Sequence, residues 1–193
     1  MTTKIKLNPL YKVLMGAFTL SIFSEGIILP IYAIFVQKVG GDLLDAGLAM
    51  GIFLISQGLF SILFHRLLWS HKKRMLFLVL GWLMWVIGIA SYLIISSVWM
   101  LFVTQVLTAL GNAIADPIFD QELASKTDKK IAEFEWGFFE GSRDIVSGLA
   151  AIVGAVIVSI WSFDALIYVM VLTASLSLSL IVLYSRLSKK VFS

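Results

Sequence analysis

The sequence contains no cysteine, only three prolines and few charged residues. The absence of cysteine from all 193 residues excludes disulfide bonds, zinc–thiolate sites and thiol catalysis. Charged residues make up 14% of the chain, whereas about one quarter is usual in a soluble domain. No Gly-x4-Gly-Lys-Ser/Thr loop occurs, so the chain is not expected to hydrolyse ATP itself. The low charge content indicates that water is not the main solvent of this protein.

Apolar residues are abundant instead, at 60% of the chain with a mean hydropathy of +0.97. A helix needs about 20 apolar residues to cross the hydrocarbon of a bilayer. Six stretches are long enough, and the breaks between them are short. They cover residues 11–36, 46–64, 75–96, 98–119, 134–160 and 164–185. The sequence therefore predicts an all-α membrane protein, with one six-helix transmembrane domain over residues 1–193.

The distribution of basic residues predicts the orientation. Lysine and arginine favour the cytoplasmic side of a membrane, and four basic segments alternate with the predicted spans so that all four share one side. These residues are Lys4, Lys6, Lys12, Arg66, Lys72, Lys73, Arg74, Lys126, Lys129, Lys130, Arg186, Lys189 and Lys190. The opposite side carries only Lys38. We expect both termini to be cytoplasmic, in a plasma or inner membrane, and expect no nucleic-acid partner, because the basic residues follow the membrane topology.

Glycines recur with the same spacing in the second and fifth spans. The offsets of +4 and +11 appear in both, 90 residues apart, at Gly47, Gly51 and Gly58 and at Gly137, Gly141 and Gly148. Pro30 and Pro117 similarly end the first and fourth spans. This pattern predicts two inverted three-helix repeats, residues 11–96 and 98–185, an arrangement typical of transporters. The alternative is that glycine simply permits close packing of membrane helices.

Glu25 lies in the middle of the first predicted span. Ionisable groups at membrane depth are costly and are functional candidates by default. A lone carboxyl group in apolar surroundings can exchange protons near neutral pH, which is the chemistry that a proton-coupled carrier needs. The alternative is that Glu25 stays protonated and only forms hydrogen bonds with Ser24 or a neighbouring helix.

The fifth predicted span carries Glu140, Arg143 and Asp144 near membrane depth. Trp136, Glu140 and Asp144 share one helical face, and Arg143 flanks it. A polar stripe on an apolar span favours a water-filled cavity, in which Glu140 and Asp144 join Glu25 in proton coupling. The alternative is an ion-pair network around Arg143 that only locks the helices together.

Three amides lie at membrane depth, at Gln57, Gln105 and Asn112. Each is a candidate to orient substrate, although amides also hold membrane helices together. We interpret the tryptophans, including Trp82 and Trp85, mainly as anchors at the membrane surface, with Trp136 as the exception that faces the cavity. The sequence provides no metal-binding cluster and no catalytic arrangement, so we expect neither a cofactor nor enzyme activity.

Several segments resemble the amino-terminal half of the major facilitator superfamily. The first span ends in GIILPIYAIFVQ, and the fourth reads QVLTALGNAIADP, in which Ala109, Gly111 and Pro117 fit the family pattern. Gln105 stands where the family has arginine. The loop FHRLLWSHKKRML keeps only the basic end of the family's gate signature, and the fifth span, GFFEGSRDIVSGLAAIVGA, is glycine-rich but lacks its Gly-Pro pair.

The resemblance implies half of a twelve-helix fold. In that family two six-helix halves are related by an axis along the membrane normal, and a parallel homodimer would restore this axis. Family geometry implies that the second span faces the partner's fifth span, so the two glycine stripes would form the interface. We expect a proton-coupled secondary transporter in the lipid bilayer that carries a small polar or cationic solute. The alternatives are a non-transporting assembly or regulatory subunit, or an isolated half of a larger transporter.

Overall fold

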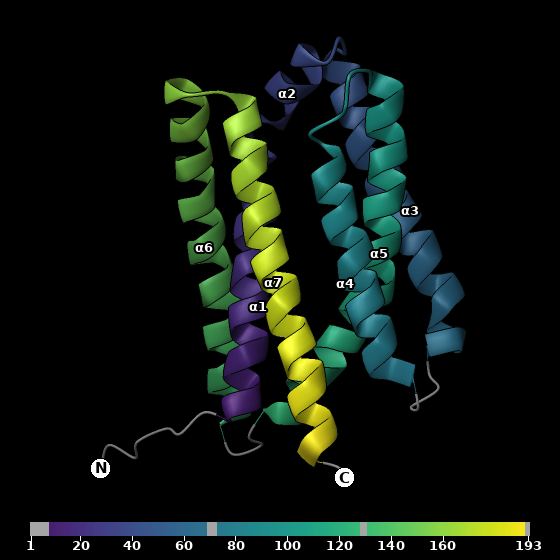
Figure 1. Cartoon of the computed structure of the whole chain (residues 1–193), viewed down its shortest axis with the longest axis vertical. Coiled ribbons are helices and arrows are strands. Elements are labelled where there is room, and N and C mark those ends of the chain that lie inside the picture. The colour runs from purple at the N-terminus through teal and green to yellow at the C-terminus, as the bar shows by residue number, and fades with distance from the viewer. Residues whose placement is uncertain (1–7, 69–72, 128–130, 192–193) are drawn as a thin grey trace.

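The computed structural model describes residues 8–68, 73–127 and 131–191, which form a bundle of helices joined by short loops (Figure 1). In chain order these are α1 (Pro9–Gly26), the 3-10 helix η1 (Leu29–Ile31), α2 (Tyr32–Lys38), α3 (Leu43–Leu68), α4 (Arg74–Ser91), α5 (Val98–Lys126), α6 (Ala132–Ile160) and α7 (Phe163–Val191). Parts of the predicted basic clusters, including Lys4, Lys6, Lys72, Lys129 and Lys130, lie outside the described residues.

Six segments of the described chain are long and apolar enough to cross a membrane. They are Pro9–Lys38, Leu43–Phe64, Arg74–Ser91, Val98–Lys126, Ala132–Ile160 and Phe163–Ser188. The prediction of six spans is therefore confirmed. The start of α1 and the end of α7 lie at the same end of the bundle (Figure 1), as an even number of spans requires.

Two predicted boundaries are wrong. The third span was expected to reach residue 96, but α4 ends at Ser91 because the next three backbone N–H groups donate to carbonyls three residues back, which tightens the chain into a turn. The fourth span was expected to end at residue 119, with a loop from Asp120. Instead α5 continues to Lys126, since its acidic residues find partners within the bundle.

The first span is broken between α1 and α2. Pro30 has no N–H group to donate to the Gly26 carbonyl. The Ile31 N–H, which would serve the Ile27 carbonyl in a regular α-helix, donates to the Ile28 carbonyl instead, at 3.0 Å. The helix therefore leaves its regular hydrogen-bond ladder for one 3-10 turn before α2 resumes.

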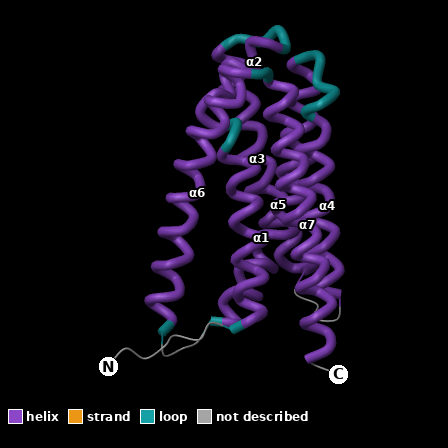
Figure 2. The backbone as a smooth tube through the Cα atoms, turned by 60° about the vertical axis from the view of Figure 1, so that its left-hand side comes forward, coloured by secondary structure: helices purple, strands orange, loops and turns teal. Residues whose placement is uncertain are grey.

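The packing centres on α1, α4, α5 and α7. α1 packs against α7 and α6, α5 packs against α4 and α3, and α4 packs against α7. As a result α3 and α6 occupy opposite sides of the bundle (Figure 1), and α6 forms an edge of it (Figure 2).

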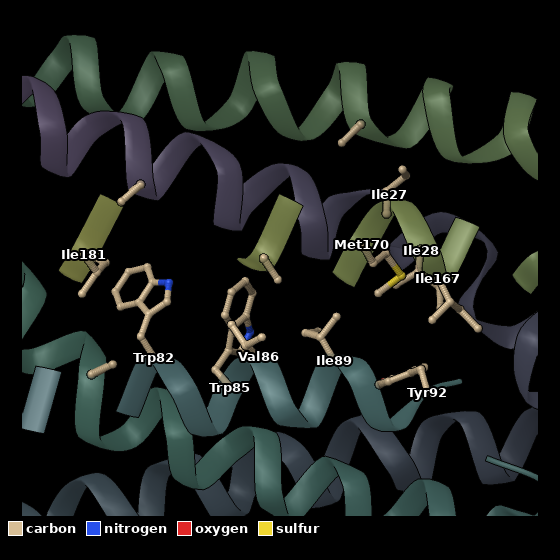
Figure 3. Close-up of a cluster of buried hydrophobic side chains, with 14 of the residues drawn as sticks. Ile27, Ile28, Trp82, Trp85, Val86, Ile89, Tyr92, Ile167, Met170 and Ile181 are labelled. Carbon is tan, nitrogen blue, oxygen red and sulfur yellow. The ribbon is translucent and has the colours of Figure 1, made fainter. Parts of the chain in front are cut away.

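Two tryptophans of α4 belong to this core rather than to the membrane surface. Trp82 and Trp85 are 5% and 3% exposed and project from α4 toward α1 and α7 (Figure 3). Trp82 Nε1 donates to Ser177 Oγ at 3.0 Å, and Ser177 Oγ donates to the Ala17 carbonyl at 2.7 Å. The interpretation of these two residues as surface anchors is wrong, because each indole N–H has an acceptor within the bundle, which removes the need to reach the interface.

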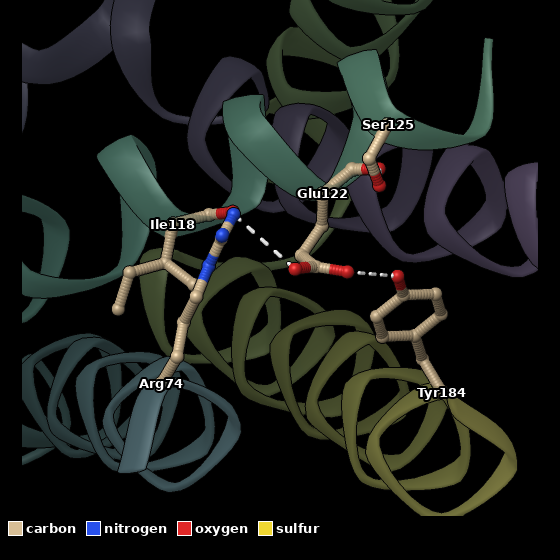
Figure 4. Close-up of polar contacts among 5 residues, drawn as sticks. All are labelled: Arg74, Ile118, Glu122, Ser125 and Tyr184. Carbon is tan, nitrogen blue, oxygen red and sulfur yellow. Dashed lines mark hydrogen bonds and ion pairs between the residues drawn. The ribbon is translucent and has the colours of Figure 1, made fainter. Parts of the chain in front are cut away.

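A buried ion pair joins α4, α5 and α7 near the ends of the helices (Figure 4). Arg74 Nη2 lies 3.2 Å from Glu122 Oε1 and donates to the Ile118 carbonyl at 3.4 Å. The Tyr184 hydroxyl donates to the other carboxylate oxygen of Glu122. The ion pair explains how a charged segment that reads as a loop continues as helix inside the bundle.

Two sets of helical glycines differ in their surroundings. A Cβ on Gly81, Gly88, Gly111 or Gly154 would come within 3.0 Å of a neighbouring segment of the bundle, so these glycines permit close packing. A Cβ on any of the six predicted interface glycines, at positions 47, 51, 58, 137, 141 and 148, would meet nothing within 4 Å. The predicted stripes on α3 and α6 therefore do not serve packing within this bundle.

Gly154→Ala is expected to destabilise the bundle. Its Cβ would lie 1.8 Å from the Ile27 carbonyl oxygen, so α6 must move away from α1. Overpacking of this kind costs about 1–3 kcal/mol, or a fall of about 2–12 °C in melting temperature for a chain of this size. Thermal unfolding of the purified protein in detergent measures the effect. Leu172→Ala, on the exposed face of α7, is the control, and equal melting temperatures for the two variants would contradict the packing described here.

Candidate functional site

A cavity of about 490 Å³ lies between α1, α3, α4, α5 and α6. This volume is within the range of about 300–1,000 Å³ typical of small-molecule sites. Its polar lining residues are Glu25, Gln57, Asn112, Asp116, Asp120, Glu140 and Arg143, together with Ser21. Its aromatic lining residues are Phe18, Phe53, Trp82, Trp85, Phe119, Trp136 and Phe139. The cavity thus places several charged groups inside helices that are otherwise apolar.

Glu25 is held at the cavity wall by neutral donors. Trp85 Nε1 donates to Glu25 Oε1 at 2.7 Å, and Asn112 is a second hydrogen-bond partner. The nearby Ser24 hydroxyl donates to the Met170 carbonyl at 2.9 Å rather than to Glu25. The carboxyl group is therefore oriented by α4 and α5, not by its own helix.

Three residues of α5 extend from Glu25 along one face of the cavity. Asn112, Asp116 and Asp120 are spaced by four residues, so they lie one above another on the helix, and all three line the cavity. Gln57 Nε2 of α3 donates to Asp116 Oδ2 at 2.9 Å. Asp116 interacts electrostatically with both Glu25 and Asp120. Glu25, Asp116 and Asp120 thus form a continuous line of carboxyl groups, which we call the acidic row.

The basic residue of the cavity lies on α6. Arg143 Nη1 is 3.5 Å from Glu140 Oε2, one turn earlier, and both side chains are about half exposed. Arg143 also interacts electrostatically with Glu25 and Asp120. The cavity lining thus contains one guanidinium group and four carboxyl groups.

Most of the predicted site residues meet at this cavity. Glu25, Gln57, Asn112, Trp136, Glu140 and Arg143 all line it, although they come from four helices. Gln105 does not line it: the Gln105 amide is buried and donates to the hydroxyl groups of Tyr32 and Tyr92, the latter at 3.2 Å. Asp144 is exposed on α6 and is not among the lining residues. Proton coupling and substrate binding by these residues stay predictions.

The sequence reasoning missed part of the acidic row. Asp116 and Asp120 are not among the predicted site residues, and Asp120 lies just beyond the predicted fourth span, residues 98–119. The signal that could have found both is the four-residue spacing from Asn112 through Asp116 to Asp120, which is the period of one helix face. Trp85 carried no such signal, because its partner Glu25 is 60 residues away in sequence.

The carboxyl groups do not form a metal site. Among the residues that the structure describes, no group of three or more histidine, aspartate or glutamate side chains is arranged to hold a metal ion. What the arrangement offers chemically is exchangeable protons, fixed negative charge and aromatic surface within a membrane-spanning bundle.

Comparison with known families agrees with this architecture. Residues 14–191 match the Major Facilitator Superfamily, whose members are membrane transporters rather than enzymes. No curated protein matches the chain. Since the family match spans nearly all of the described helices, and these form six apolar membrane spans, the chain belongs to the Major Facilitator Superfamily and is an integral membrane transporter of that family.

Proposed function

We propose that this transporter is proton-coupled and carries a small polar or cationic solute through the cavity described above. The observation that carries the proposal is the acidic row, which reaches Glu25 from the half of the bundle where α6 begins. Ionisable groups at this depth are costly to bury unless they serve an ion or substrate pathway. Reversible protonation of the row changes the charge of the cavity, and a change of charge is what couples proton movement to solute movement.

The basic residues support a cytoplasmic location for both termini. The acidic row extends toward the same end of the bundle, so it would open toward the cytoplasm. Lys12 lies in the first turns of α1, Lys126 ends α5 and Arg186 lies near the end of α7, all at one end of the bundle (Figure 1). Lys38 lies at the opposite end, where it pairs with Asp164 at 3.2 Å. Basic residues favour the cytoplasmic side.

The direct test is solute-evoked proton movement in proteoliposomes that contain a trapped pH dye. Organic cations, sugars and anionic solutes are added in turn under a clamped membrane potential. We expect at least one class to change the internal pH only when the protein is present. Counterflow of a solute without any proton movement would contradict proton coupling while leaving transport itself intact.

We also propose that the six-helix unit works as a parallel homodimer. The six open glycines on α3 and α6 support this, because small residues allow helices to approach closely and no helix of the same bundle occupies that space. A second copy, related by an axis along the membrane normal, would bring α3 of one unit against α6 of the other. Each unit would then contribute half of a central cavity.

Cysteine cross-linking tests this arrangement. Two differently tagged single variants, Gly51→Cys on α3 and Gly141→Cys on α6, are co-expressed in a chain that has no other cysteine. Oxidation of the membranes is expected to give a product that carries both tags. Leu172→Cys, on the exposed face of α7, replaces Gly51→Cys in the control. Equal yields in the two experiments, or no product together with a monomeric mass in detergent, would contradict the homodimer.

A further inference from the structure

The charge balance of the cavity points to the class of solute. Glu25, Asp116, Asp120 and Glu140 line it, and Arg143 is the basic residue among its lining. Arg143 already pairs with Glu140. The acidic row must therefore share Arg143 with Glu140, and it has no ion pair of its own with this residue. Taking carboxylates out of water without a compensating positive charge is costly. The row is therefore balanced either by protons or by a cation that enters the cavity.

The hydrogen bonds of the row leave it available to such a cation. Glu25 and Asp116 accept from the Trp85 indole and the Gln57 amide, which are neutral donors that orient the carboxyl groups without cancelling their charge. A sugar site would use such amides to bind hydroxyl groups, but here the Gln57 amide is committed to Asp116. The same carboxyl groups would repel an anionic solute.

The walls beside the acidic row are aromatic and stacked. The Phe18 ring stacks on Phe119 and Phe139, with centroids 5.6 and 4.4 Å apart. The ring centroids of Trp82 and Phe119 lie 5.4 Å apart, and the rings of Trp136 and Phe139 meet in a T-shaped arrangement with centroids 5.6 Å apart. Aromatic faces attract cations and stack on flat rings. Such walls favour a solute whose positive charge is carried on or beside an aromatic ring.

We propose that the cavity binds flat aromatic organic cations, with Asp116 recognising the positive charge and the Phe18, Phe119 and Phe139 rings holding the aromatic part. This inference rests on the proposed function only in taking the cavity as the solute path. Protons and the cation then compete for the same carboxyl groups, so uptake of one is linked to release of the other. Asp116 occupies the central position of the row, between Glu25 and Asp120.

Ethidium is the probe, because it is a flat aromatic cation whose fluorescence reports binding directly. The full chain is reconstituted in nanodiscs, and empty nanodiscs correct for partition into lipid. We expect saturable binding that proflavine, another flat aromatic cation, displaces and that lactose and benzoate do not displace. Asp116→Asn keeps the size of the side chain and is expected to weaken ethidium binding by about tenfold or more, the scale of losing one charge-assisted contact.

Asp164→Asn is the matched control, because Asp164 is exposed in the first turn of α7 and pairs with Lys38 outside the cavity. We expect its affinity for ethidium to equal that of the unmodified protein, and melting temperatures show that both variants are folded. Displacement by lactose, binding no greater than in empty nanodiscs, or equal affinity in Asp116→Asn would overturn the inference. Binding is measured at equilibrium without a proton gradient, so a failure of proton coupling would instead appear as ethidium binding without ethidium-evoked proton movement.

Discussion

Replacing Glu25 with glutamine is expected to abolish accumulation of solute driven by a proton gradient, while exchange of solute across the membrane continues. Glutamine has the same size and can still accept the hydrogen bond that Trp85 donates, so the cavity keeps its shape. What it loses is the exchangeable proton. We expect gradient-driven uptake into proteoliposomes to fall by about 100-fold or more, a loss typical of removing a group that acts directly on a proton.

Counterflow of labelled solute in the same proteoliposomes separates coupling from binding. Counterflow is expected to stay within about threefold of the unmodified protein, because glutamine still accepts the Trp85 hydrogen bond and preserves the shape of the cavity. Asp164→Asn, a charge removed from the surface pair with Lys38, serves as control for changes in total charge. If the Glu25→Gln protein accumulated solute with an unchanged dependence on pH, Glu25 would have no part in coupling.

The second large effect is expected at Glu122, where loss of the carboxylate leaves Arg74 buried without its ion-pair partner. The side chains of Arg74 and Glu122 are only 19% and 10% exposed, so water cannot compensate fully. Breaking a buried pair in this way costs about 3–5 kcal/mol. Glu122→Leu should therefore lower the melting temperature by about 6–20 °C in a chain of this size.

A double variant shows whether the uncompensated charge is the cause. Arg74→Met combined with Glu122→Leu removes both charges and should recover most of the lost stability, since apolar replacement of a whole buried pair is often neutral. Tyr184→Phe, which removes only the hydroxyl donor to Glu122, should cost about 1 kcal/mol. A double variant as unstable as Glu122→Leu would show that packing, rather than charge, dominates at this position.

The six spans were predictable because the bilayer imposes a simple requirement on each of them. Long apolar segments are needed to cross hydrocarbon, and such segments are visible in the sequence without knowledge of any contact. Where the spans end was less predictable. Residues after Ser91 are still apolar although the helix has ended, and the charged residues after Phe119 are still helical, because Arg74 and Tyr184 provide partners that hydropathy does not report.

The site was predictable to the extent that burial of charge is unusual in itself. Glu25 and Arg143 stood out because few ionisable residues occur inside apolar spans, and both line the cavity. Gln105 satisfied the same criterion equally well, yet its amide is used by two tyrosine hydroxyls. Polarity at membrane depth identifies candidates, but only the partner residues, which come from distant parts of the chain, distinguish a cavity from a packed contact.

The break in the first span has a consequence for the order in which the protein enters the membrane. The Ile27 carbonyl leaves the regular ladder of its own helix, and it is covered by α6 at Gly154, where the two backbones meet directly. Backbone groups left without partners in lipid cost several kcal/mol each. During synthesis the first span emerges more than 100 residues before Gly154, so until α6 arrives its polar kink must be sheltered by the translocation machinery or by water at the bilayer surface. The final placement of the first span in the bilayer therefore waits for the fifth span.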